Sequence, residues 1–165
     1  MAKKILILNK ERINWKLRRM AYEIWEHNSK ETEITLIGIE GSGIAVAKDL
    51  ARRLGEISKI RVEVLTIRMN KKDLLQSAAE LKEDLTGKSI VIVDDVANSG
   101  KTLLYGIRSV LSYELKRILV AVLVDRKHKS YPVSADIVGH SVATTLQEHI
   151  EVVCEGEAIT AAYLQ

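Results

Sequence analysis

The sequence has little of what holds very small or secreted domains together. Its 165 residues include one cysteine (Cys154), one proline and no phenylalanine, and aromatic residues make up 4% of the chain. A single cysteine excludes an internal disulfide framework and any Cys-rich zinc module. Because aromatics are so few, the core must be aliphatic. With no Gly/Ser-rich linker and a length close to that of one domain of roughly 150 residues, we expect a single domain over residues 1–165.

A strong net charge and a long apolar run are also missing. Lysine and arginine (25) exceed aspartate and glutamate (22) by three, which is too small an excess to argue for nucleic acid binding. No apolar run approaches the roughly 20 residues of a membrane span, and the N-terminus leads directly into a short apolar strand instead of a signal peptide. The sequence therefore predicts a cytoplasmic protein with no membrane partner.

Short apolar runs alternate with segments of helical periodicity. Continuous runs such as residues 90–93 are typical of strands that are covered on both faces. Runs of strand length occupy residues 5–8, 34–39, 60–67, 90–93, 118–124, 137–138 and 150–153. This alternation predicts an α/β fold with a mostly parallel central sheet flanked by helices. Ligands of such sheets bind beyond the carboxyl ends of the strands. We therefore expect the site in the turns after Ile39, Ile67, Val93 and Val124.

Three helices are expected between these strands. Residues 10–28 have apolar positions at helical spacing, and Asn9 is a suitable N-cap for them. A second apolar helix face ends near Leu54, with Gly55 at the expected C-cap. A third helix begins at about Gly100. Residues 70–87 are polar and only loosely periodic, so they are expected to form a loop or a short helix.

The turn after Val93 carries the strongest functional signal. Asp94 and Asp95 end an apolar strand, where two carboxylates are costly unless hydroxyl or cationic groups meet them. The next residues favour an anion instead, because Gly100 lets consecutive amides face inward at a helix N-terminus. Ser99 and Thr102 add hydroxyl donors. Acids for sugar hydroxyls or a magnesium-bound group thus lie beside amides for a phosphate, which is the polarity of a ribose 5-phosphate.

Two commoner explanations compete for this turn. Gly100-Lys101-Thr102 matches the end of a Walker A loop, but the first glycine of that motif would fall at Asp95, whose charge repels a nucleotide phosphate. Alternatively, Asp94 and Asp95 only cap or ion-pair at the strand end. That reading leaves the adjacent phosphate-type turn unexplained.

A second glycine turn follows the strand at residues 34–39. Gly41-Ser42-Gly43 precedes a helix as in a dinucleotide-binding fingerprint, but the third glycine of that pattern is replaced by Val46. The turn still predicts a second anion site at a helix N-terminus. Two anion sites on one sheet suit a substrate with phosphate groups at two ends.

Four segments together resemble a known family. VIVDDVANSGKT (residues 91–102) closely resembles the 5-phosphoribosyl 1-pyrophosphate (PRPP) signature of type I phosphoribosyltransferases. LIGI (residues 36–39), AVLVDRKHK (residues 121–129) and VSADIVG (residues 133–139) extend the match over nearly the whole chain. Together they resemble the PyrR family of bifunctional pyrimidine-operon regulators and uracil phosphoribosyltransferases, which implies a type I phosphoribosyltransferase fold with a small hood.

The resemblance also implies a role for each matching residue. Asp94 and Asp95 would bind the ribose hydroxyls of PRPP, directly or through Mg²⁺, and Arg68 would meet pyrophosphate from the start of the catalytic loop. The base would lie beside Asp125 and Arg126. Pyrophosphate would bind Gly41, Ser42 and Gly43. The 5-phosphate would be held by Ala97, Asn98, Ser99, Gly100, Lys101 and Thr102.

Some positions depart from the family pattern. Ser42 stands where the family has an arginine, so this loop supplies no charge there. After Arg68 the family has two acids and a longer loop, whereas this chain continues into Lys71 and Lys72, which could replace the missing cation or be surface lysines. His140 replaces a family lysine.

Two functions from different classes follow. The first is an enzyme that transfers phosphoribose from PRPP to a pyrimidine base, with uracil expected and a purine as a less favoured variant. The second is a nucleotide-sensing regulator that binds RNA, with little or no catalysis. Its surface could use the basic run at residues 126–129 and arginines on the first two helices, namely Arg18, Arg19, Arg52 and Arg53. The family forms dimers and tetramers, so a homodimer or larger assembly is expected, and Trp15 and Trp25 could mark a subunit interface or belong to the core.

Overall fold

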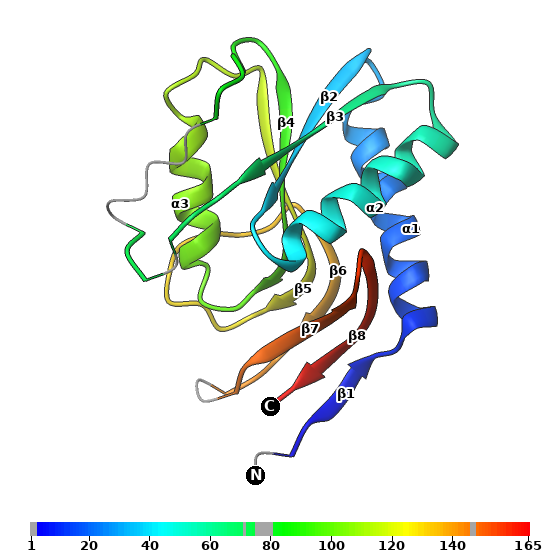
Figure 1. Cartoon of the computed structure of the whole chain (residues 1–165), viewed down its shortest axis with the longest axis vertical. Coiled ribbons are helices and arrows are strands. Elements are labelled where there is room, and N and C mark those ends of the chain that lie inside the picture. Colours follow the sequence, from blue (N-terminus) through cyan, green and yellow to red (C-terminus); the bar gives the residue numbers. More distant parts are fainter. Residues whose placement is uncertain (1–2, 71, 75–80, 146–147) are drawn as a thin grey trace.

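The computed structural model describes residues 3–70, 72–74, 81–145 and 148–165 (Figure 1). In order the elements are β1 (Ile5–Leu8), α1 (Lys10–His27), β2 (Glu33–Ile39), α2 (Ser42–Ile57), β3 (Arg61–Ile67), β4 (Ser89–Ala97), α3 (Lys101–Val110), β5 (Arg117–Arg126), β6 (Ile137–Val142), β7 (Ile150–Glu155) and β8 (Ala158–Leu164). Strands and helices alternate as far as β3, α3 lies between β4 and β5, and three strands follow β5.

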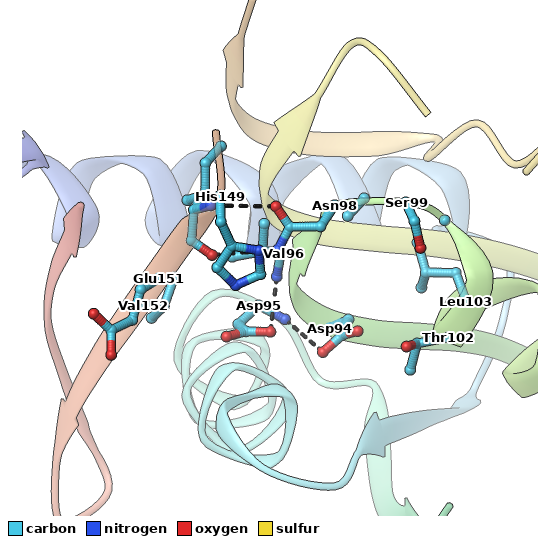
Figure 2. Close-up of a pocket in the computed structure, with 13 residues that line it drawn as sticks. Asp94, Asp95, Val96, Asn98, Ser99, Thr102, Leu103, His149, Glu151 and Val152 are labelled. Atoms are coloured by element: carbon cyan, nitrogen blue, oxygen red, sulfur yellow. Dashed lines mark hydrogen bonds between the residues drawn. The ribbon is translucent and has the colours of Figure 1, made fainter. Parts of the chain in front are cut away.

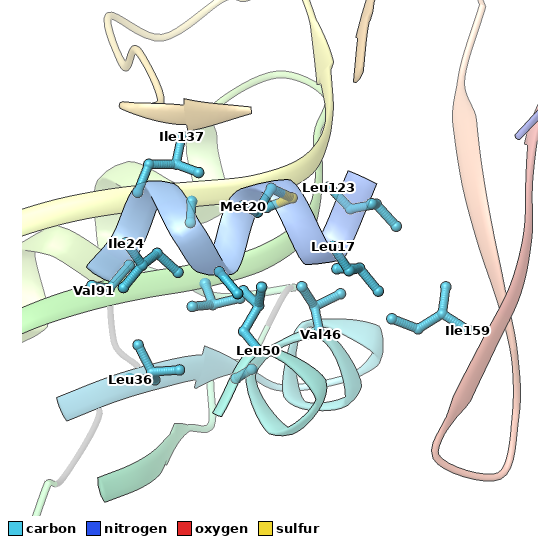
Figure 3. Close-up of a cluster of buried hydrophobic side chains, with 14 of the residues drawn as sticks. Leu17, Met20, Ile24, Leu36, Val46, Leu50, Val91, Leu123, Ile137 and Ile159 are labelled. Atoms are coloured by element: carbon cyan, nitrogen blue, oxygen red, sulfur yellow. The ribbon is translucent and has the colours of Figure 1, made fainter. Parts of the chain in front are cut away.

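Five strands form the predicted parallel sheet, in the order β3-β2-β4-β5-β6. The central strand β4 alternates between two hydrophobic clusters. Val91 and Val93 belong to the cluster beneath α1 and α2, in which Figure 3 shows Val91. Ile90 and Ile92 belong to the cluster beneath α3. All four are fully buried. The expectation of an α/β fold with helices on both faces of a parallel sheet is therefore confirmed.

The remaining three strands form a small antiparallel sheet in the order β1-β8-β7, which we call the hood sheet. It joins the two ends of the chain, since Ile5 of β1 lies opposite Leu164 of β8. In Figure 1 it lies beyond the arrowheads of β4 and β5, at the carboxyl ends of the parallel strands. Strand β8 was not predicted from the sequence. It pairs antiparallel with β7 on one side and with β1, from the other end of the chain, on the other side. Local periodicity does not reveal such pairing.

Helix boundaries agree with the sequence except at one end. Asn9 caps α1 as expected, its side chain accepting the Arg12 amide at 2.9 Å. The predicted C-cap at Gly55 is wrong, because α2 continues to Ile57. Ser58 ends the helix instead, through its amide and its hydroxyl, both donated to the Leu54 carbonyl. A hydroxyl side chain therefore does here what a glycine was expected to do.

Two further expectations concern the loop before β4 and the tryptophans. The described residues between β3 and β4 form no helix, and residues 71 and 75–80 of the segment expected to be a loop or a short helix lie outside the described residues. Trp15 and Trp25 do not pack in the core, because 61% and 39% of their surfaces are exposed. None of the helices in the described ranges is both long enough and apolar enough to span a membrane.

Candidate functional site

The site begins where β4 extends beyond the end of its pairing with β2. The register between these strands ends at Gly38 and Val93, whereas β5 stays paired with β4 as far as Ala97 and Asp125. Asp94 and Asp95 therefore lie on the last residues of the strand, and the expectation of a turn directly after Val93 is corrected. Because the chain turns from β2 into α2 at this point, β4 has no pairing with β2 at the acid pair.

Both carboxylates accept a hydrogen bond from the next residue along the strand. Asp94 is 6% exposed, and its Oδ1 accepts the Asp95 amide at 2.9 Å. Asp95 is half-buried, and its Oδ1 accepts the Val96 amide at 2.8 Å (Figure 2). These bonds orient the two side chains along the strand.

The segment after β4 forms an open helix N-terminus. Gly100 is the N-cap of α3 and adopts φ = 82°, a left-handed conformation that glycine reaches without steric cost. Gly100 has no side chain to cap the helix, and the first turn holds no acidic residue. The Ser99 hydroxyl accepts the Lys101 amide at 3.2 Å. The later amides of the first turn and the positive end of the helix dipole are thus available to an anion.

A cavity of about 360 Å³ brings the acid pair and this turn together (Figure 2). Of the residues assigned to the 5-phosphate, all except Lys101 line it, and Lys101 is exposed to solvent. The lining consists of Asp94, Asp95, Val96, Ala97, Asn98, Ser99, Gly100, Thr102, Leu103, His149, Ile150, Glu151 and Val152. The bipolar arrangement expected from the sequence is therefore present in one cavity.

The hood sheet supplies one wall of the cavity, which sequence reasoning missed. His149, Glu151 and Val152 line the cavity from the start of β7. The Asn98 side chain holds this wall in place, donating to the Ile150 carbonyl and accepting the Ile150 amide, both at 3.2 Å. The signal available in the sequence was the short apolar run at residues 150–153, which does not say where the strand packs.

The second glycine turn faces a different environment. Gly41 adopts φ = 100° and caps α2 without a side-chain hydrogen bond. A Cβ on Gly43 would lie 2.8 Å from Asp94 Oδ1 and 3.1 Å from the Val93 carbonyl, so this helix N-terminus packs directly against the carboxylate. None of Gly41, Ser42 and Gly43 lines the cavity. An acid, the exposed Glu40, precedes the turn.

Arg68 lies next to this turn. Ile39 and Ile67 are register partners at the ends of β2 and β3, and the Glu40 amide donates to the Ile67 carbonyl at 2.9 Å. Arg68 follows at once and is exposed, so it places a cation at this part of the sheet edge. Lys72 is also exposed, whereas Lys71 lies outside the described residues.

The two residues assigned to the base do not line the cavity. Asp125 is ion-paired with Lys129, with a distance of 2.6 Å between Nζ and Oδ1. Arg126 is buried and donates to the carbonyls of His128 and Glu148 at 3.2 and 2.6 Å. Arg126 therefore ties two loops together at the end of β5. His140, on the neighbouring strand, has a lowered pKa because burial and the charges of Lys16 and Arg12 disfavour its protonated form.

The residues present suit Mg²⁺ better than a metal caged by protein. Within the described parts of the chain, no group of three or more His, Cys, Asp or Glu side chains could hold a metal ion. Mg²⁺ usually binds through one or two carboxylates together with waters and substrate phosphates. The carboxylates of Asp94 and Asp95, which line one cavity with the α3 turn, fit that mode.

Comparison with known proteins assigns the chain to a family. The sequence model of the phosphoribosyl transferase domain family matches residues 6–155, and the chain belongs to this family. Within it, the chain is similar to proteins named Bifunctional protein PyrR. Those of Bacillus cereus (strain AH820) and Bacillus thuringiensis subsp. konkukian are each 33% identical over 164 residues, covering 92% of this chain and 91% of the relative. The predicted resemblance is confirmed.

Solved structures share the fold at lower identity. A hypoxanthine phosphoribosyltransferase of Trypanosoma cruzi matches with a TM-score of 0.75 and 19% identity, covering 83% of this chain and 81% of that one. A hypoxanthine-guanine phosphoribosyltransferase from Bacillus anthracis matches with a TM-score of 0.74 and 21% identity, covering 84% and 82%. At these identities the likeness concerns the fold alone, so it does not choose between purine and pyrimidine bases.

Proposed function

We propose that this protein transfers the 5-phosphoribosyl group of PRPP to a pyrimidine base, with uracil as the expected acceptor, and releases pyrophosphate. The observation that carries the proposal is the single cavity in which the Asp94–Asp95 pair faces the uncapped N-terminus of α3. Carboxylates accept hydrogen bonds from ribose hydroxyls, and first-turn amides donate to a phosphate. A ribose 5-phosphate satisfies both ends at once.

The protein's part in the reaction is mainly binding and orientation. Asp94 and Asp95 would hold the ribose while the amides and hydroxyls at Ser99, Gly100 and Thr102 hold its 5-phosphate. Arg68 would approach the pyrophosphate, which a nitrogen of the base replaces on the anomeric carbon. The wall formed by His149, Ile150 and Val152 would keep water from that carbon. Fixed reactants and preorganised charges supply most of the catalysis in this kind of site.

Mg²⁺ belongs to the same proposal. Asp94 and Asp95 would hold it together with oxygens of the substrate, where it would offset the negative charge of the leaving pyrophosphate. Turnover should therefore require a divalent cation and stop when the cation is chelated.

A panel of bases tests the proposed reaction. The full chain is incubated with PRPP, Mg²⁺ and one of uracil, cytosine, hypoxanthine, guanine or adenine, and released pyrophosphate is measured. Release with uracil supports the proposal, and release only with hypoxanthine or guanine replaces it with the purine variant. Absence of release with all five bases contradicts an enzymatic role.

Asp95→Asn tests the ribose assignment separately. We expect weaker PRPP binding by calorimetry with an unchanged melting temperature, because the substitution removes a charge from a half-buried carboxylate without changing its shape. Glu26→Gln, which removes the same charge on the exposed C-terminal part of α1, is the matched control and should bind PRPP like the wild type. Equal affinity of Asp95→Asn and the control would count against the assignment.

The alternative of a nucleotide-sensing RNA-binding regulator has less support at the surface first considered for it. Arg52 and Arg53 pair with Asp49, and Arg52 also pairs with Glu56. Arg19 pairs with Glu23. Three of the four arginines are thus offset by acids. Binding of a pyrimidine-leader RNA that falls steeply with salt and responds to nucleotide would nevertheless favour this function.

A homodimer or larger assembly is also proposed. Trp15, Tyr22 and Trp25 are exposed large side chains on one side of α1, because their spacings of seven and three residues return to the same helix face. Aromatic residues gathered on a surface are typical of protein interfaces. Sedimentation of the purified protein tests this, and a monomer at micromolar concentration would contradict it.

A further inference from the structure

The loop between β5 and β6 folds against the outer side of the α3 turn. The amides of Ser130 and Tyr131 both donate to the Ser99 carbonyl at 3.1 Å. A Cβ on Gly100 would lie 3.3 Å from both Lys129 Cδ and the Tyr131 carbonyl. The phosphate-accepting turn is therefore enclosed between the cavity on one side and this loop on the other.

One ion pair fastens this loop to the strand that precedes it. Lys129 Nζ lies 2.6 Å from Asp125 Oδ1, and the two side chains are only 12% and 15% exposed. That carboxylate oxygen is itself buried and accepts no hydrogen bond within the described structure, so the ammonium of Lys129 is what offsets its charge. Breaking a buried pair by removing one partner is costly, because it leaves the other charge uncompensated.

The Asp125–Lys129 ion pair lies beside both ends of the turn between β4 and α3. Asp125 is the register partner of Ala97, the last residue of β4 before the turn. Lys129, four residues later, contacts Gly100 at the start of α3. The Lys129 side chain thus connects the strand end beside Ala97 with the one residue of the turn that needs a left-handed backbone.

We propose that Lys129 is a positioning residue for the 5-phosphate: its ion pair with Asp125 holds the loop against Gly100 and so keeps the amides of the α3 turn directed at the cavity. The inference rests on the proposed function, because it assumes that this turn binds the phosphate of a ribose 5-phosphate. Lys129 does not line the cavity and acts through Gly100 and Ser99.

The inference is tested with ribose 5-phosphate, a probe that carries the sugar and one phosphate but neither base nor pyrophosphate. Its affinity for the full chain is measured by calorimetry. We expect Lys129→Met to weaken binding about tenfold, since small displacements of binding groups cost this much or more. Lys129→Arg keeps the charge and should stay within about threefold of the wild type. Lys127→Met alters an exposed lysine of the same loop and should have no effect.

A second variant covers the case in which Lys129→Met does not fold. Asp125→Asn removes the charge from the other partner while keeping its shape, and it should also weaken ribose 5-phosphate binding several-fold. Because the probe lacks a base, this loss cannot come from the proposed role of Asp125 beside the base. The ¹⁵N-amide signal of Gly100 should shift in Lys129→Met and Asp125→Asn but not in Lys127→Met.

The outcomes separate the two proposals. If the wild type binds ribose 5-phosphate and Lys129→Met or Asp125→Asn, still folded, binds it within twofold, the ion pair is only a structural contact and the inference is overturned. If the wild type does not bind ribose 5-phosphate, the proposed function fails and the inference fails with it. A selective loss in the Lys129 and Asp125 variants, with recovery in Lys129→Arg, supports both.

Discussion

The N-termini of α2 and α3 are locally alike and yet face different surroundings. Each follows a parallel strand, each has a glycine N-cap with positive φ (Gly41 at 100°, Gly100 at 82°), and neither has a side-chain cap or an acid in its first turn. The α3 turn opens into the cavity. The α2 turn packs against Asp94 through Gly43 and follows the acidic Glu40.

This contrast shows that a glycine turn and a helix dipole do not by themselves make a phosphate site. The positive end of a helix stabilises any negative group that lies close to it, whether this belongs to a ligand or to the protein. At α2 the carboxylate of Asp94 lies beside Gly43, whereas at α3 the first turn lines the cavity. The second anion site expected at α2 stays a prediction, and the exposed Arg68 follows the neighbouring strand end.

The largest expected effect comes from removing the hydroxyl of Thr102, with removal of the Ser42 hydroxyl at the other turn as the comparison. Thr102→Val should weaken ribose 5-phosphate binding by about 1–3 kcal/mol, the usual value of a hydrogen bond to a charged group. Ser42→Ala, at the start of α2, should leave this affinity unchanged because Ser42 does not line the cavity. Calorimetry on both variants measures the difference. Equal losses at the two positions would mean that both turns hold the same phosphate.

Replacing each N-cap glycine by alanine should lower the free energy of unfolding at both positions, but it should weaken ribose 5-phosphate binding at only one of them. Gly100→Ala and Gly41→Ala both force a positive φ on a residue with a Cβ, which costs about 1–2 kcal/mol of stability. Only Gly100→Ala should also weaken ribose 5-phosphate binding, because its turn faces the cavity. Chemical denaturation and calorimetry report the two effects. A loss of affinity in Gly41→Ala as large as in Gly100→Ala would contradict the contrast.

The smallest expected effect concerns the acid in front of α2. Glu40→Gln should lower the KM for PRPP about twofold at low salt by removing a repulsion from the pyrophosphate end, and this gain should vanish at high salt because Glu40 is exposed. Ribose 5-phosphate, which has no pyrophosphate, should bind as before. Steady-state kinetics at two ionic strengths provide the measurement. An unchanged KM at low salt would show that Glu40 lies too far from the leaving group to matter.

Local sequence determined much of this protein. The apolar runs at β2, β4 and β5 and the helical spacing of α1 and α2 predict the parallel α/β sheet, because strands buried on both faces need continuous aliphatic residues. The acid pair and the glycine-containing turn are adjacent in the chain, so their juxtaposition at the end of β4 required no long-range information. The family resemblance likewise depends on short contiguous motifs.

Tertiary structure decided the rest, since it depends on residues that are far apart in the chain. Strand β7 lines the cavity as part of a sheet that pairs it with β8 and β8 with β1, and the Asn98 side chain bonds Ile150 across 52 residues. The close approach of Asp94 to Gly43 at the start of α2 depends on how far β4 extends beyond β2. The Lys129–Asp125 pair is close in sequence, but its contact with Gly100 depends on a loop returning to β4. Such contacts depend on the order in which the strands pair in the sheets, so no local sequence pattern predicts them.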